Sequence, residues 1–138
     1  MNNDDKIVKW LFKTEAFKVA PSDRPFWYTS GTIGPYYINT HFLYGGEAEA
    51  SEMLEFIDNA KEDALSCPQK ILQKEIARYE SDKIYRGVID AITAFIKENP
   101  SMSQIGFISG GERRDWFFSL LPAYLLKLPH IMLFKDGK

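Results

Sequence analysis

A glycine-rich turn followed by two arginines is the segment best suited to bind an anion. Gly110 and Gly111 separate a short apolar run from an amphipathic stretch, and Glu112, Arg113 and Arg114 follow at once. Glycine lets backbone N–H groups approach a phosphate closely, and the N-terminus of a following helix favours negative charge. The two guanidinium groups could add charge-assisted hydrogen bonds. The alternative is an ordinary strand-to-helix turn with solvated or paired arginines, and the sequence leaves both interpretations open.

A second candidate segment, residues 28–39, combines glycines, hydroxyls and two adjacent tyrosines. Ser30 and Gly31 belong to a predicted loop, and Tyr36 and Tyr37 could stack on a planar base beside it. Successive side chains of a strand point to opposite faces, so only one of these tyrosines can face a given pocket. Composition alone favours the alternative, a hairpin whose aromatic rings pack in the core.

The third candidate lies at the end of the sequence, where Lys135 and Lys138 follow an apolar run of strand length. Ligands of open α/β sheets bind beyond the carboxyl ends of the strands, so a lysine placed there could reach one. The alternative is a solvated charged tail. Other site types lack support, because the chain has neither a P-loop nor a dinucleotide-binding fingerprint and no recognisable serine triad.

The elements that would position these residues begin with a turn-rich first third. Helical spacing of apolar residues predicts a helix over 5–13, and residues 17–19 have the composition of a short strand. Two runs rich in β-forming residues, 26–30 and 36–40, flank the glycine-bearing loop. This pattern predicts a β-hairpin.

Three amphipathic helices are predicted in the middle of the chain. The first begins at Glu47, and its apolar face extends as far as Leu65. Pro68 fits the first turn of the second helix, and Ser81 or Asp82 fits the N-cap of the third.

A strand, a glycine turn, a helix and a second strand are predicted at the end of the chain. Residues 105–109 and 131–135 should form adjacent or near-adjacent parallel strands, bridged by a helix that starts after Glu112. Pro122 should kink that helix or end it early, because its ring collides with the carbonyl group four residues before it. The fold class is therefore α/β, in a single unit over residues 1–138.

In their order along the chain, the three candidate segments resemble the N-terminal half of orotate phosphoribosyltransferase and its type I phosphoribosyltransferase relatives. Residues 30–39, SGTIGPYYIN, are similar to the family signature S-G-x-x-S-P-Y-Y-x-[DN], which is the most specific match. Residues 107–114 are similar to the strand and loop that hold pyrophosphate, and residues 135–138 to the start of the mobile catalytic loop. The resemblance implies a partial phosphoribosyltransferase-like parallel sheet, with an N-terminal β-hairpin region and a helical insertion.

The resemblance also implies a function, the transfer of a 5-phosphoribosyl group from its diphosphate to a nucleobase such as orotate. Mg²⁺ is expected for the complete enzyme, although no metal ligand is evident in this chain. The implied roles are pyrophosphate binding for Gly110, Gly111, Glu112, Arg113 and Arg114, and catalytic loop cations for Lys135 and Lys138. Substrate binding is implied for Ser30, Gly31, Tyr36 and Tyr37, of which the two tyrosines would lie near the base.

The chain departs from the family pattern at three positions. Thr29 stands where a lysine is common, Gly34 where a serine is common, and Asp115 where the pyrophosphate loop usually closes on a glycine. The acidic strand and Thr/Gly-rich loop that normally follow do not occur before Lys138. Residues 1–138 are therefore expected to be an N-terminal portion without transfer activity. The alternative is a non-catalytic phosphate-binding, nucleotide-binding or interaction module derived from the same fold.

Composition further limits the classes of function that this chain could have. A net charge of −2 over 138 residues argues against a broad nucleic-acid-binding face. Cys67 is the only cysteine and no H-x-x-x-H spacing occurs, so neither an internal disulfide nor a metal site built on such residues is expected. No apolar run has transmembrane length and no signal-peptide core is seen, which favours a cytoplasmic protein. Its amphipathic helices and uncovered sheet edge predict a homodimer or higher oligomer.

Overall fold

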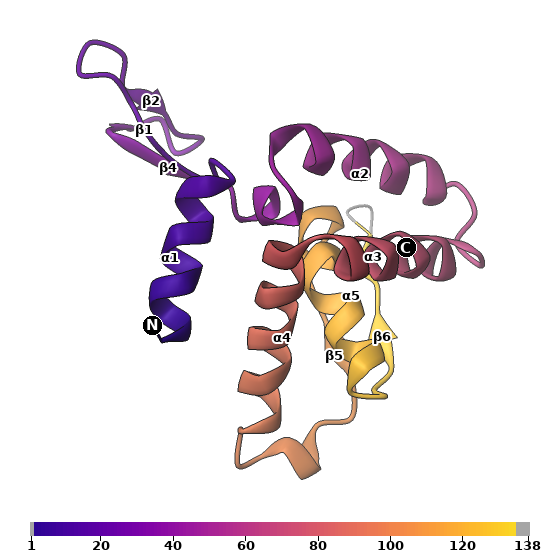
Figure 1. Cartoon of the computed structure of the whole chain (residues 1–138). Coiled ribbons are helices and arrows are strands. Elements are labelled where there is room, and N and C mark those ends of the chain that lie inside the picture. Colours follow the sequence, from indigo (N-terminus) through magenta and orange to yellow (C-terminus); the bar gives the residue numbers. More distant parts are fainter. Residues whose placement is uncertain (1, 135–138) are drawn as a thin grey trace.

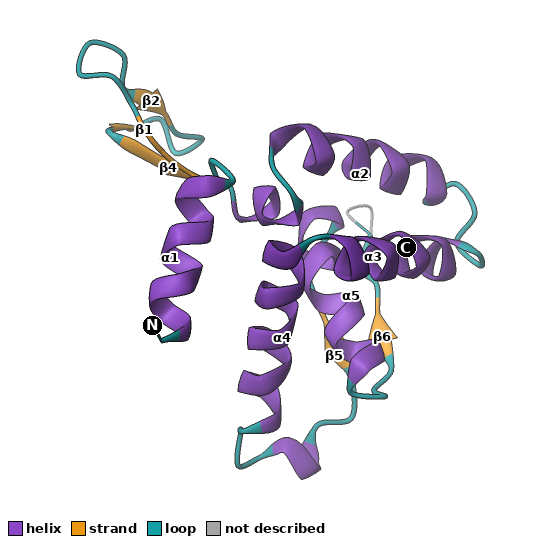
Figure 2. Ribbon diagram, in the orientation of Figure 1, coloured by secondary structure: helices purple, strands orange, loops and turns teal. Residues whose placement is uncertain are grey.

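The computed structural model describes residues 2–134, which form a mixed α/β structure (Figure 1). It has a helical body and, near its N-terminus, an arm rich in β-structure that is formed by residues 17–38. Figure 2 shows that the strands are short and lie at two separate places, in the arm and beside the last helix. The helices are α1 (Asn3–Lys13), α2 (Glu47–Ala60), α3 (Cys67–Ser81), α4 (Lys83–Lys97) and α5 (Trp116–Leu125), with short 3-10 helices η1 (Thr40–Tyr44), η2 (Met102–Gln104) and η3 (Arg113–Asp115). The strands are β1 (Phe17–Val19), β2 (Phe26–Trp27), β3 (Ile33–Gly34), β4 (Tyr36–Ile38), β5 (Ile108–Ser109) and β6 (His130–Ile131).

The strand pairing of the arm differs from the predicted hairpin. β2 pairs antiparallel with β3, whereas β4 pairs antiparallel with the earlier strand β1. The change of partner falls at Pro35, which has no N–H to continue the ladder with β2. Its carbonyl oxygen instead accepts a 2.7 Å hydrogen bond from Ala20 N–H, just beyond β1. The prediction that 26–30 pairs with 36–40 is therefore wrong, although a short strand over 17–19 is confirmed.

The helical middle follows the prediction except at the end of α2. The helix stops at Ala60, so Leu65 lies outside it and is 95% exposed. Asp63 is the local cause, because its carboxylate accepts hydrogen bonds from Leu65 N–H at 3.2 Å and Ser66 Oγ at 2.6 Å. Such side-chain bonds to nearby groups compete with helix continuation.

Capping residues set the starts of α3 and α4 as predicted. Pro68 lies in the first turn of α3, where its missing N–H costs nothing. Asp82 caps α4 by accepting a 2.8 Å hydrogen bond from Tyr85 N–H. The Tyr85 hydroxyl donates in turn to the Phe117 carbonyl at 2.6 Å, which ties α4 to α5.

The core lies where α2, α3, α4 and α5 meet. Its largest fully buried side chains come from all four of these helices. Aromatic side chains contribute directly, since the ring centroids of Tyr44 and Tyr85 lie 4.9 Å apart and those of Tyr44 and Phe117 lie 5.2 Å apart. Burying such large rings removes much apolar area from water, which stabilises the body.

The predicted βαβ order at the end of the chain is confirmed. β5 and β6 are adjacent and parallel, with Ile108 opposite His130, and α5 lies between them in the sequence. The strands are shorter than the predicted runs 105–109 and 131–135, and the second run extends beyond the described residues. α5 continues through Pro122 and ends three residues later at Leu125, so proline removes only a hydrogen bond near the end of the helix.

One face of the β5–β6 pair is uncovered in the described chain. Phe107, Ile131 and Leu133 are 54%, 43% and 51% exposed, whereas Met132 and Phe134 pack against the core. Parallel strands are normally covered on both faces. Self-association, which the sequence predicts, stays a prediction. An uncovered apolar face is consistent with it. Among residues 2–134, no helix combines the length and apolarity needed to cross a bilayer.

Candidate functional site

The glycine–arginine segment lies at the carboxyl end of β5, next to the carboxyl end of β6. Ser109 joins the two strands there, because its hydroxyl lies within hydrogen-bonding distance of the Ile131 carbonyl at 3.1 Å and the Gly110 carbonyl at 3.0 Å. The chain then turns through η3 into α5. This edge is the position at which ligands of open α/β sheets bind.

The two glycines lie close to side chains of the segment that leads into α5 and of α5 itself. A Cβ on Gly110 would lie 2.6 Å from Ser119 Oγ, and one on Gly111 would lie 2.2 Å from Asp115 Oδ2. Gly111 N–H donates a 3.0 Å hydrogen bond to that Asp115 oxygen, and Trp116 Nε1–H donates to the Gly111 carbonyl at 3.0 Å. The Asp115 carboxylate thus occupies the position that a bound anion would take at Gly111.

Asp58, near the end of α2, and Lys61, the residue after that helix, are the partners of Arg113 and Glu112. Lys61 Nζ lies 2.6 Å from Glu112 Oε1, with both side chains about three-quarters buried. Asp58 holds Arg113 with two contacts of 2.9 Å, from Nη2 to Oδ2 and from Nε to Oδ1. Arg113 also takes a strained backbone conformation, with φ +47°, in the left-handed region that favours glycine.

Arg114 is the cation of this segment that stays available. Its side chain is exposed, and within residues 2–134 it forms no ion pair. His41 of η1 lies near it and is 7% exposed. Burial, followed by the positive charge of Arg114, lowers the pKa of the His41 imidazole. A neutral His41 therefore adds no positive charge at neutral pH.

A buried serine–histidine pair lies beneath the same edge. Ser119 Oγ and His130 Nε2 are 2.8 Å apart, joining α5 to β6. His130 Nδ1 has no hydrogen-bond partner among the described residues, and burial lowers the pKa of the ring. A catalytic triad needs an acid at that nitrogen. Among residues 2–134 no acid completes such a triad, and the contact that the structure shows is a link between α5 and β6.

The second candidate segment forms the arm and is internally packed. Gly31 occupies a turn at φ +86°, and Ser30 Oγ lies 2.9 Å from the hydroxyl oxygen of Thr32. Tyr36 stacks on Phe17 at 5.7 Å, on the opposite face of the strand from Tyr37. The two tyrosines point to opposite faces as expected.

Packing inside the arm also accounts for Gly34, where the resembling family has serine. A Cβ on Gly34 would lie 2.1 Å from the Tyr28 hydroxyl oxygen. That hydroxyl donates to the Tyr36 carbonyl, and the Tyr28 ring lies 6.2 Å from the Tyr37 ring. Glycine therefore makes room for Tyr28, and both Tyr28 and Tyr37 stabilise the arm itself.

The structure keeps the candidate segments apart. The arm projects away from the helical body, whereas the Gly110–Arg114 segment lies between α2, η1 and α5 (Figure 1). Ser30, Gly31, Tyr36 and Tyr37 therefore do not share a site with Gly110–Arg114 in this conformation. Lys135 and Lys138 lie outside the described residues.

Sequence reasoning missed the residues that surround the glycine–arginine segment. Asp58 and Lys61 are more than 50 positions away in the chain, and no local signal connects them to Arg113 and Glu112. Within the part of the chain that the structure describes, no three His, Cys, Asp or Glu side chains gather as metal ligands. Comparisons with protein-family models, curated proteins and solved structures found no match to this chain.

Proposed function

We propose that the chain supplies the diphosphate-facing edge of a phosphoribosyltransferase-like protein, one that transfers a 5-phosphoribosyl group to a nucleobase. The observation that carries the proposal is the position of Gly110–Arg114 at the carboxyl ends of two adjacent parallel strands. This position of the segment agrees with the order of motifs on which the sequence resemblance rests. Ligands bind at this end of open α/β sheets for topological reasons that do not depend on any one family.

Arg114 is the residue expected to contact the diphosphate first. Its guanidinium group is exposed and forms no ion pair with another described residue, so it can offer several N–H donors to phosphate oxygens. The start of α5 adds a favourable dipole beside it. As pyrophosphate leaves, a fixed cation would stabilise the negative charge that develops on it.

The described carboxylates at this edge do not fit a role in holding Mg²⁺. Asp115 accepts from Gly111 N–H, and Glu112 lies 2.6 Å from Lys61 Nζ. Mg²⁺ is usually held by one or two carboxylates together with substrate phosphates and water. We therefore assign it no ligand among these residues and derive no step through it.

The hydrogen bond from Gly111 N–H to the Asp115 carboxylate favours a second function, that of a non-catalytic binding or interaction module. A carboxylate on Gly111 N–H repels a phosphate and occupies the donor that would bind it. The Arg113–Asp58 ion pair removes a further cation from the edge. In this alternative the edge has lost its ligand, and the uncovered face of β5 and β6 contacts a second protein surface.

Replacing Arg114 with alanine should weaken pyrophosphate binding about tenfold, since one charge-assisted contact is lost. Isothermal titration calorimetry at low ionic strength measures this, because salt screens exposed charges. Arg24→Ala is the matched control: Arg24 is also exposed, lies in the arm and is 3.8 Å from Asp23. Equal binding by the wild type and Arg114→Ala would exclude Arg114 from the site.

A further inference from the structure

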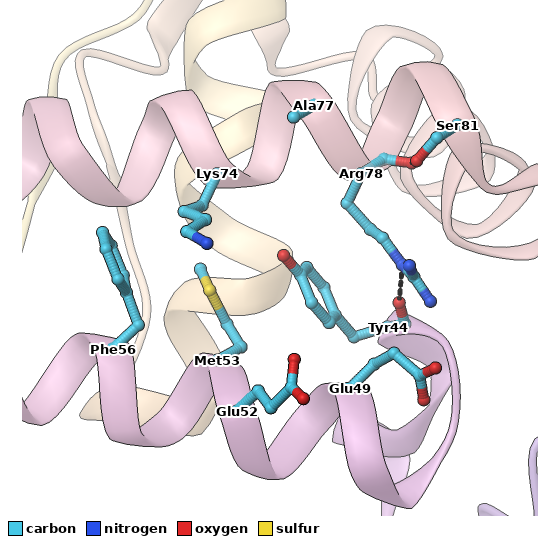
Figure 3. Close-up of a pocket in the computed structure, with 9 residues that line it drawn as sticks. All are labelled: Tyr44, Glu49, Glu52, Met53, Phe56, Lys74, Ala77, Arg78 and Ser81. Atoms are coloured by element: carbon cyan, nitrogen blue, oxygen red, sulfur yellow. Dashed lines mark hydrogen bonds between the residues drawn. The ribbon is translucent and has the colours of Figure 1, made fainter.

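A small cavity between α2 and α3, remote in the sequence from the glycine–arginine segment, has the features of a separate ligand site. It has a volume of about 240 Å³ and lies between the facing sides of α2 and α3 (Figure 3). Drug-sized ligands occupy cavities of about 300–1,000 Å³, so an occupant of this one must be smaller. Two helical stripes, each with the i, i+3, i+4, i+7 spacing of one helix face, form its walls: Glu49, Glu52, Met53 and Phe56 from α2, and Lys74, Ala77, Arg78 and Ser81 from α3.

Both carboxylates on the α2 wall lack a cationic partner. Within residues 2–134, no Lys, Arg or His nitrogen lies within 4.0 Å of a carboxylate oxygen of Glu49 or Glu52. They are one helical turn apart, and Figure 3 shows both side chains on the α2 side of the cavity. Facing helices with opposite charges commonly form ion pairs, so their absence here leaves two acceptors for a positively charged group.

The two cationic side chains on the α3 wall differ in how many hydrogen-bond and ion-pair partners they already have. Arg78 donates from Nε to the Tyr44 carbonyl at 2.6 Å, and its Nη2 lies 3.5 Å from Asp82. Lys74 Nζ lies 5.0 Å from the Phe56 ring centroid and has no carboxylate within 4.0 Å among the described residues. An ammonium group has three donors, so Lys74 can still bind an anion.

We propose that this cavity binds a small zwitterion of the free amino acid class. The ammonium group of the ligand lies against Glu49 and Glu52, and its carboxylate accepts from Lys74. A side chain of moderate size packs against Met53, which is 3% exposed, and against Phe56. A ligand with only one kind of charge would match one wall and be repelled by the other.

L-Leucine is a suitable probe because two analogues each lack one of its charges. 3-Methylbutylamine lacks the carboxylate, and 4-methylpentanoate lacks the ammonium group. NMR of ¹³C-methyl-methionine protein gives a local readout, because Met53 lines the cavity whereas Met102 and Met132 do not. We expect L-leucine to shift the Met53 methyl signal saturably, and each analogue to bind at least about tenfold more weakly, as loss of one charged contact predicts.

Variants of the charged residues test the orientation of the ligand. Glu52→Gln and Lys74→Gln should each weaken L-leucine binding about tenfold. Glu55→Gln and Lys70→Gln are matched controls, because both residues are exposed on the same two helices and neither lines the cavity. These controls should bind L-leucine as the wild type does, and all four variants should keep the wild-type affinity for pyrophosphate.

Two results would overturn the proposal. One is a Met53 signal that L-leucine leaves unshifted or shifts without saturation. The other is an affinity for the ligand that does not change when one charge is removed, either from L-leucine or from the protein at Glu52 or Lys74. Neither result concerns pyrophosphate binding at Gly110–Arg114, so this proposal and the proposed function can fail independently of each other.

Discussion

Replacing Glu75 with leucine will raise the free energy of unfolding by about 1–3 kcal/mol at pH 8, because an unpaired buried polar group carries a desolvation penalty of that size. Glu75 lies on α3 and is 0% exposed. Neither of its carboxylate oxygens has a hydrogen-bond partner among the described residues. Leucine has no polar atom to desolvate, so it avoids the cost of burying a polar group that has no hydrogen bond.

The same substitution should change how stability depends on pH. Burial raises the pKa of Glu75 well above its usual value of 4.5, and the nearby Leu121 backbone only partly opposes this. The groups facing it are the rings of Tyr44 and Tyr85, whose own pKa values are raised by burial and by Glu75. The folded protein keeps the Glu75 proton at pH values where the unfolded chain has lost it. Its stability therefore falls as pH rises from 4.5 towards the folded pKa.

Urea unfolding at pH 5 and pH 8 measures both effects. The difference between Glu75→Leu and the wild type should be larger at pH 8, and Glu75→Gln should also remove the pH-dependent loss. Glu80→Gln is the control, since Glu80 is an exposed carboxylate on the same helix. A Glu75→Leu protein that is less stable than the wild type at pH 8 would show that the carboxylate has a stabilising partner.

Replacing Asp115 with glycine should strengthen pyrophosphate binding at least about tenfold, a gain of about 1.4 kcal/mol in binding free energy. The substitution removes a negative charge and releases the Gly111 N–H from its 3.0 Å hydrogen bond. It also places glycine at the position where the family that the sequence resembles usually has one. The expected cost is a moderate loss of stability, because glycine at the start of α5 is more flexible in the unfolded chain.

Asp115→Asn separates the two contributions. It removes the charge but keeps an oxygen that can accept from Gly111 N–H, so its affinity for pyrophosphate should lie between those of the wild type and Asp115→Gly. Asp23→Gly is the matched control, because Asp23 is exposed and lies in the arm. Calorimetric titration of all four proteins at equal ionic strength gives the comparison. Unchanged affinity in Asp115→Gly would favour the non-catalytic interaction module.

Local signals explain why the helical part of the fold could be predicted. Pro68 and Asp82 mark helix starts through their own backbone chemistry, and the structure places both as expected. Leu65 shows the limit of periodicity, because its spacing fits the apolar face of α2 but the Asp63 carboxylate ends the helical region first. Side-chain hydrogen bonds of this kind are not visible in an apolar pattern.

The candidate site was less predictable, because its decisive contacts are long-range. The sequence identified the Gly110–Arg114 segment and its position after a strand. It did not reveal that Asp58 from α2 pairs with Arg113, or that Asp115 turns back onto Gly111. Strand pairing in the arm was mispredicted for a related reason: β1 competes for β4 from outside the predicted hairpin.

Amide NMR is the most direct measurement of whether the edge after β5 binds a diphosphate. In a ¹⁵N–¹H titration of the wild-type chain with pyrophosphate, the signals of Gly110, Gly111 and Arg114 should shift saturably. Those of Gly31 and Gly34, in the distant arm, should stay in place (Figure 1). Shifts confined to residues outside Gly110–Asp115, or no saturable shift in either the wild type or Asp115→Gly, would contradict the diphosphate-binding account.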